Sequence, residues 1–140
     1  MSVPRERSKA VATWLAVLGG TFGLHRFYLH GGRDVLGWLH PWPSLVGAYG
    51  FWRLRQLGLD DVAGSRLVPL LGAMVALGML AAVVIGLTPA DRWRGRWGER
   101  GAGTGWATVI GVVVAVAVGA TATMATIAYT AQRYFELRTP

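Results

Sequence analysis

Residues 67–87 read LVPLLGAMVALGMLAAVVIGL, 21 consecutive side chains without a charge. A transmembrane α-helix needs about 20 apolar residues, and the buried helices of soluble proteins are usually shorter. A second uncharged stretch, residues 105–131, is longer still. It is rich in valine and threonine, which favour strands in water, but a lone strand in lipid would leave its backbone groups unpaired. Both stretches are therefore predicted to be transmembrane helices.

The composition of the whole chain agrees with a membrane protein. Hydrophobic side chains make up 53% of the residues and charged side chains only 15%, whereas a soluble domain carries about 25% charged residues. The apolar residues fall into blocks, and the short stretches between the blocks hold nearly all the arginines. The basic N-terminal residues 1–9 precede an apolar run, but no small-residue cleavage site follows, so removal of a signal peptide is not expected.

Two further apolar stretches lie nearer the N-terminus. Residues 10–29 reach the length of a span if Arg26 extends to the lipid headgroups. Residues 35–54 contain Pro41 and Pro43, so a helix there is expected to start after Pro43 or to kink at that point. With these two stretches, the chain is predicted to be an all-α integral membrane protein of about four transmembrane helices.

The predicted organisation is an N-terminal helical hairpin, residues 1–62, followed by a second pair of spans, residues 63–140, joined by a loop rich in arginine and tryptophan. With four spans, eight basic residues lie on the side of the termini and six on the other side. The positive-inside rule then places both termini in the cytoplasm. The short basic N-terminus suits a bacterial inner membrane. No internal repeat of fixed period is apparent.

A short motif ends the first apolar stretch, where residues 25–29 read HRFYL. Nearby positions share its pattern of glycines and aromatic residues: Gly20, Phe22, Gly23, Gly37 and Trp52. Over about residues 7–54 the chain resembles the two-transmembrane-helix (TM-two) domain family. The resemblance implies a helical hairpin with a short connection at the HRFYL motif, and it implies no activity, because the family's biochemical role is largely undefined. The chain departs from the family at His30, where a glycine is usual, and after Trp52, where an aspartate is often found.

Arg26, with Phe27 and Tyr28 beside it, is a candidate contact for lipid or for a partner protein. A charge near lipid is costly unless it is paired or reaches water. Its guanidinium could bind a lipid phosphate, supported by the aromatic rings. Alternatively, Arg26 could pin the turn by binding helix-end carbonyls or Asp34.

The stretch 91–100 reads DRWRGRWGER and alternates cations with indoles. Trp93 and Trp97 are four residues apart, so a short helical turn would place both on one face as an interfacial anchor. A surface for a partner protein is the alternative, because tryptophan and arginine dominate binding hot spots. The candidate contact residues of this stretch are Arg92, Trp93, Arg94, Arg96 and Trp97.

Small residues recur at steps of four in three of the predicted spans. Such stripes let two helix backbones approach closely in a membrane. The predicted packing residues are Gly19 and Gly23 in the first span, Gly78, Ala82 and Gly86 in the third, and Gly111, Ala115 and Gly119 in the fourth.

Several kinds of chemistry are not expected. The chain has no cysteine, its carboxylates all lie outside the predicted spans, and no glycine-framed serine resembles a hydrolase nucleophile. The spacing of His25, His30 and His40 fits no metal motif. The arginines are dispersed among all the connections, which argues against nucleic acid and favours membrane lipids as the anionic partner. The chain is therefore predicted to be no enzyme and to need no cofactor or metal.

The favoured function is that of a structural or accessory membrane protein, which packs against itself or against a larger membrane complex. The glycine stripes, the Arg/Trp stretch and the absence of polar groups within the spans motivate this prediction. The alternative is an oligomeric pore or a small-solute transporter, in which Thr121, Thr123 and Thr126 would line a polar path.

Overall fold

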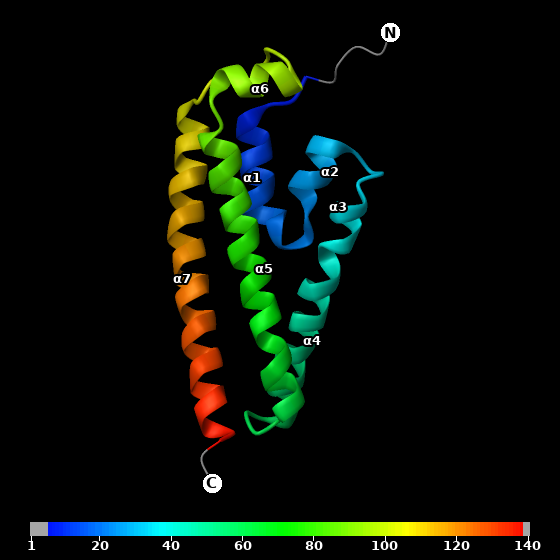
Figure 1. Cartoon of the computed structure of the whole chain (residues 1–140), viewed down its shortest axis with the longest axis vertical. Helices are drawn as coiled ribbons and strands as arrows, with labels where there is room; N and C mark the ends of the chain where they lie inside the picture. Colours follow the sequence, from blue (N-terminus) through cyan, green and yellow to red (C-terminus); the bar gives the residue numbers. More distant parts are fainter. Residues whose placement is uncertain (1–5, 139–140) are drawn as a thin grey trace.

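The computed structural model describes residues 6–138, and this part of the chain forms helices and no strands. The molecule is elongated, with its longest helices along the long axis (Figure 1). In chain order the helices are α1 (Lys9–Gly19), the 3-10 helix η1 (Gly20–Phe22), α2 (Leu24–His30), α3 (Val35–Leu39), α4 (Pro41–Leu57), α5 (Val62–Leu87), α6 (Ala90–Trp97) and α7 (Trp106–Glu136).

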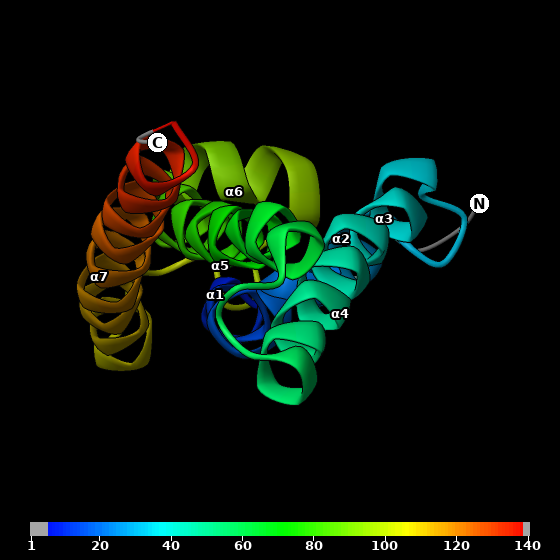
Figure 2. The same ribbon diagram turned by 90° about the horizontal axis from the view of Figure 1, so that it is seen from below.

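Helices α5 and α7 are long and apolar enough to cross a membrane, as the two uncharged stretches predict. They run side by side in opposite directions, and α5 lies between α7 and α4 (Figures 1 and 2). Helix α5 also contacts α1 and η1, so it is the central element of the fold. Within the described residues, no other helix reaches the length and apolar character of α5 and α7.

The prediction that residues 10–29 form one transmembrane span is wrong, because this stretch turns back on itself. Helices α1 and η1 reach the middle of α5, where a Cβ on Gly20 would lie 2.7 Å from the Cα of Gly78. Gly23 then adopts a φ of 76°, which favours glycine, and α2 returns toward the start of α1. There the Ser8 N–H donates a hydrogen bond to the Tyr28 hydroxyl at 3.0 Å. The HRFYL motif therefore lies within α2 and not at a connection between two full-length helices.

The proline-containing stretch is divided close to the predicted position. Helix α3 ends at Leu39, and α4 begins at Pro41, a place where proline is tolerated because the first turn of a helix needs no N–H donors. Together α3 and α4 extend from the level of α2 to the end of the molecule opposite α6 (Figure 1). Helix α4 packs tightly on α5, since a Cβ on Gly47 would lie 2.3 Å from the backbone nitrogen of Leu71.

The predicted placement of both termini on one side does not match the fold. The described chain starts beside α6 and ends at the far end of α7, at the opposite end of the long axis (Figure 1). The physical reason is the reversal at Gly23, which returns the chain to its starting end before three long passes follow: α3 with α4, α5, and α7.

The small-residue stripes of α5 and α7 lie at helix contacts, as predicted. Ala82 and Ala115 are fully buried, and a Cβ on Gly86 or Gly119 would meet the opposing helix at 2.2 or 2.8 Å. Gly78 meets η1, and Gly111 meets Thr13 of α1. The first stripe is different: Gly19 faces Leu24 across the reversal, and Gly23 forms the reversal itself. These two glycines therefore permit a turn and do not form a helix face.

Candidate functional site

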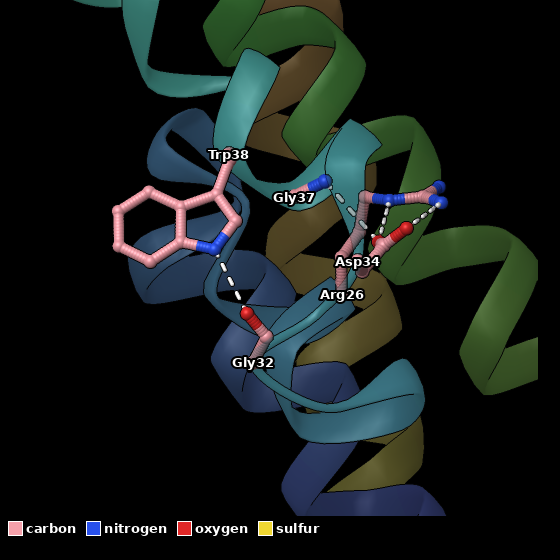
Figure 3. Close-up of polar contacts among 5 residues, drawn as sticks. All are labelled: Arg26, Gly32, Asp34, Gly37 and Trp38. Carbon is pink, nitrogen blue, oxygen red and sulfur yellow. Dashed lines mark hydrogen bonds and ion pairs between the residues drawn. The ribbon is translucent and has the colours of Figure 1, made fainter.

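The turn between α2 and α3 is held by Arg26 and Asp34 (Figure 3). The Arg26 Nε donates to Asp34 Oδ2 at 2.7 Å, and Nη2 donates to Oδ1 at 3.4 Å. The same Oδ2 accepts the backbone N–H of Gly37 at 3.1 Å, so Asp34 caps the start of α3. The Trp38 indole donates to the carbonyl of Gly32 at 2.8 Å and closes the outer side of the turn. Arg26 thus fixes the turn through Asp34, one of the two predicted alternatives.

The aromatic neighbours of Arg26 contact the protein as well. The rings of Phe27 and Trp38 pack edge to face at 5.3 Å, and Phe27 also covers Gly37. The Tyr28 ring lies 5.6 Å from the guanidinium of Arg7, and its hydroxyl binds Ser8. Contact of Arg26, Phe27 and Tyr28 with lipid stays a prediction. Within the chain, Arg26 and Phe27 contact the turn and α3, whereas Tyr28 contacts the residues that precede α1.

The turn between α4 and α5 has the same construction, which the sequence reading missed. Arg53 donates to both carboxylate oxygens of Asp61, at 2.8 and 2.9 Å, and Asp61 accepts the Gly64 N–H at 2.9 Å. Gly58 has φ 89° and ψ 175°, matching the φ 88° and ψ 175° of Gly31 in the other turn. We call residues 31–34 the first turn and residues 58–61 the second turn.

The two turns belong to an internal repeat with an offset of 27 residues. Residues 20–37 and 47–64 share the pattern G-x-(F/Y)-G-x-x-R-x4-G-x2-D-V-x-G. The prediction that the chain has no internal repeat is therefore wrong. The repeat is hard to recognise because it has only two copies and because few positions within the apolar sequence are shared. The turns lie at opposite ends of the molecule, so the two hairpins point in opposite directions (Figure 1).

Both turn aspartates are held in the charged form. The hydrogen bond from Arg53 lowers the pKa of Asp61 to about 2, and the bond from Arg26 lowers the pKa of Asp34 below its usual range. The side chains of Asp61 and Asp34 are only 12% and 14% exposed. Each turn is therefore closed by an ion pair that persists throughout the physiological pH range.

The Arg/Trp stretch forms α6, and its tryptophans share one face as predicted, but this face is turned toward the protein. Trp93 is 2% exposed, and its indole donates to the Arg7 carbonyl at 2.8 Å. The guanidinium of Arg7 lies 5.2 Å from the Trp97 ring, and the His30 ring packs on Trp97 at 5.6 Å. The prediction that Trp93 anchors the protein in lipid is therefore wrong. Helix α6 lies across the end of the helix bundle, and the Trp93 indole is buried on the side of α6 that faces the protein.

The arginines of α6 are placed differently from its tryptophans. Arg92 and Arg96 are exposed and, among the described residues, have no hydrogen-bonding or ion-pair partner, whereas Arg94 binds Asp91 at 2.7 Å. A cavity of about 530 Å³ lies beside α6. Its lining combines cationic and apolar side chains, including Leu29, His30, Val84, Ile85, Arg92 and Arg96. This end of the molecule can receive an anionic group beside an apolar one, which is the chemistry of a lipid headgroup region.

Buried polar groups lie beneath this end and were not singled out from the sequence. Lys9 is fully buried, and its ammonium donates to the Thr88 carbonyl at 3.0 Å and to the Thr104 hydroxyl at 2.6 Å. It thereby ties the start of α1 to both segments that flank α6. Deeper in the bundle, the His25 and His40 rings meet edge to face at 6.0 Å. No cluster of three metal-ligating side chains occurs within residues 6–138.

Four of the five threonines of α7 are hydrogen-bonded within their own helix, and the buried hydroxyl of the fifth, Thr108, has no partner among the described residues. Each of four hydroxyls donates to the carbonyl four residues earlier, at 2.7 to 2.9 Å. These residues are Thr121, Thr123, Thr126 and Thr130. A hydroxyl that donates its proton to its own backbone presents mainly a methyl group and a lone pair outward. The surface of α7 is therefore less polar than its composition indicates.

Comparison with known proteins adds no relationship to these observations. No protein-family profile, no curated protein and no solved structure matches the chain. The similarity to the TM-two family therefore stays a prediction that rests on the motif around Arg26.

Proposed function

We propose that this chain is an integral membrane protein with a structural or accessory role, which packs the outer face of α7 against another membrane helix and performs no chemistry of its own. The exposure of α7 is the observation that supports this proposal. The helix packs mainly on α5 and α1, and its other side is apolar. Trp106, Ile110, Val113 and Met124 on that side are 51% to 81% exposed. A surface of this extent is unfavourable in water and is the usual contact surface in a bilayer.

In the proposed topology three segments cross the bilayer and a fourth enters only halfway. Helix α5, helix α7 and the α3–α4 segment cross, and α1, η1 and α2 form a re-entrant hairpin. Irregular backbone at membrane depth is tolerated where protein covers it, and the packing of Gly20 on Gly78 supplies such cover. This proposal replaces the four spans expected from hydropathy.

The distribution of arginine favours one orientation. The end that carries α6 holds Arg7, Lys9 and Arg33 together with the four arginines of residues 92–100. The opposite end holds fewer basic residues, namely Arg53, Arg55, Arg66, Arg133 and Arg138. The positive-inside rule therefore places the α6 end in the cytoplasm and the end of α7 on the other side.

Labelling of single cysteines tests this topology, because the chain has no cysteine of its own. Gly95→Cys lies in open space on α6, and Asp60→Cys lies in the second turn. A membrane-impermeant maleimide should label Gly95→Cys only from the cytoplasmic side and Asp60→Cys only from the opposite side. Labelling of both positions from the same side would contradict three crossings.

Cross-linking tests the packing of α7. Ile110→Cys and Met124→Cys, oxidised in native membranes, should each give a covalent adduct, either with a second copy or with another membrane protein. Ala82→Cys is the matched control, because Ala82 is fully buried between helices of the same chain. The absence of adducts at both outer positions, with a single-chain mass in mild detergent, would reject the proposed role.

The pore alternative predicts flux through liposomes that contain the purified protein. The internal hydrogen bonds of Thr121, Thr123 and Thr126 remove the hydroxyl donors that such a path would use. We therefore expect no flux of ions or small solutes above that of empty liposomes.

A further inference from the structure

A groove follows the seam between α5 and α7. Its larger part is a cavity of about 660 Å³, whose walls include Gly72, Ala76 and Val83 of α5 and Ala115, Gly119 and Ala120 of α7. The polar atoms that border it are engaged, since the hydroxyls of Thr123 and Thr126 bind carbonyls of their own helix. The groove is therefore lined almost wholly by apolar groups.

A second cavity of about 570 Å³ lies at the end of the molecule that carries the second turn. Pro69 and Thr130 border this second cavity. They lie three residues from Gly72 and from Ile127, both of which border the first cavity. Steps of three and four residues keep to one face of a helix, so the two cavities follow one another along the same seam, and we treat them as two parts of one groove.

The mouth of this combined groove is basic. Arg66 is exposed and has no ion-pair or hydrogen-bonding partner in the described part of the chain. Arg138 stacks on the ring of Tyr134 at 4.5 Å, and no carboxylate pairs with it among residues 6–138. The third arginine, Arg133, is occupied, because it binds Glu136 at 2.8 Å and the Leu59 carbonyl at 2.8 Å. Two guanidinium groups without a counter-charge therefore stand at the entrance to an apolar groove.

We propose that this groove binds one anionic phospholipid, with its phosphate between Arg66 and Arg138 and one acyl chain along the seam between α5 and α7. Guanidinium binds phosphate with two parallel hydrogen bonds, and the stacking of Arg138 on Tyr134 leaves its N–H groups available. The groove from Pro69 to Val83 is about 21 Å long at 1.5 Å per residue. One leaflet's hydrocarbon layer is about 15 Å deep, so the groove accommodates a chain over that whole depth. The inference rests on the proposed insertion into a membrane and does not depend on the partner of α7.

Native mass spectrometry of the delipidated protein in mild detergent tests the proposal. Phosphatidylglycerol and phosphatidylcholine of equal chain length are added in equal amounts. We expect one bound phosphatidylglycerol per chain, with the affinity falling about fivefold for each of Arg66→Gln and Arg138→Gln. Arg55→Gln is the matched control, because Arg55 is exposed at the same end and does not line the groove. The affinity of the Arg55→Gln variant for phosphatidylglycerol should equal that of the unmodified protein.

A second pair of variants tests the position of the acyl chain. Ala76→Phe places a ring in the groove and should abolish retention of phosphatidylglycerol, and Ala117→Phe, on the exposed side of α7, should preserve it. Equal retention of the two lipids, displacement of phosphatidylglycerol by inorganic phosphate, or full retention by Ala76→Phe would each overturn the proposal. The measurement uses single solubilised chains, so its failure is distinguishable from a failure of α7 cross-linking.

Discussion

The two copies of the repeat share a turn and differ in the chain that leads into it. In both copies an arginine binds an aspartate eight residues later, and a glycine with φ near 89° ends the preceding helix. Before the first turn, the chain reverses at Gly23, which has φ 76°. Before the second turn, the equivalent Gly50 lies within the continuous helix α4. The turn is thus a local property of the motif, and the reversal is not.

The surroundings of the two glycines explain the difference. Gly23 lies against His40 and the Gly37 carbonyl, and Gly20, just before it, meets α5 at Gly78, in the second half of that helix. Gly50 instead meets Leu67 and Gly64, close to the start of α5, where α4 lies antiparallel to α5. The same short sequence therefore adopts a reversal where it abuts the middle of α5 and a helix where it runs alongside α5.

The largest effect is expected from Gly47→Val, because a Cβ there would lie 2.3 Å from the Leu71 backbone. Overpacking of this kind costs about 3 kcal/mol. The equivalent Gly20→Val should cost less, since η1 is a short irregular segment with more freedom to shift. Thermal unfolding in detergent, followed by circular dichroism, measures both variants. Gly95→Val, in open space, is the control, and a loss of stability as large as that of Gly47→Val would refute this explanation.

Gly31→Ala and Gly58→Ala test whether the two turns are equivalent. Each glycine has φ near 89° and ψ 175°, a conformation almost restricted to glycine, and nothing lies within 4 Å of an added Cβ. Backbone strain alone should therefore destabilise each variant, by about 2 kcal/mol, in the same unfolding experiment. Gly32→Ala, which also has open space and no positive φ, should leave the midpoint unchanged. Clearly unequal losses at Gly31 and Gly58 would show that context controls the turns.

The ion pairs should contribute unequally. Arg53 binds Asp61 at 2.8 and 2.9 Å, whereas the second bond from Arg26 to Asp34 is longer, at 3.4 Å. We expect Arg53→Gln to lower the unfolding midpoint by about 5 °C and Arg26→Gln to lower it by less. Double-mutant cycles with Asp61→Asn and Asp34→Asn measure each coupling. A larger coupling in the first turn would reverse the expected order.

The smallest expected effect is a dependence of the unfolding midpoint on pH in the acidic range. Because the Asp61 pKa is lowered to about 2 in the folded protein, its charged form contributes stability above the ordinary pKa of about 4. This contribution should disappear as the pH falls from about 4 to about 2. Asp61→Asn should remove this part of the acid dependence of the midpoint, and above pH 5 it should lower the midpoint by an amount that does not change with pH. An unchanged acid dependence in Asp61→Asn would show that the ion pair does not stabilise the fold.

The sequence predicts α5 and α7 well, because a long uninterrupted apolar stretch is a local property and because a lone segment in lipid can satisfy its backbone groups only as a helix. It also predicts the pairing of Arg26 with Asp34 as one alternative, since the two residues are only eight positions apart. It does not predict the second ion pair, because Arg53 and Asp61 fall where hydropathy indicates only a loop. The burial of Trp93 was missed for a similar reason: the indole is covered by the backbone of Arg7, a residue 86 positions away.

The amino-acid sequence alone determined the two long apolar helices, the glycines that end α2 and α4, and the aspartates that cap α3 and α5. Each of these depends on the solvation or backbone conformation of neighbouring residues. Only the tertiary structure decided that the chain reverses at Gly23, that its ends lie apart, and that the tryptophans of α6 face inward. These features depend on which part of α5 each segment packs against. Hydropathy along the chain carries no information on that packing.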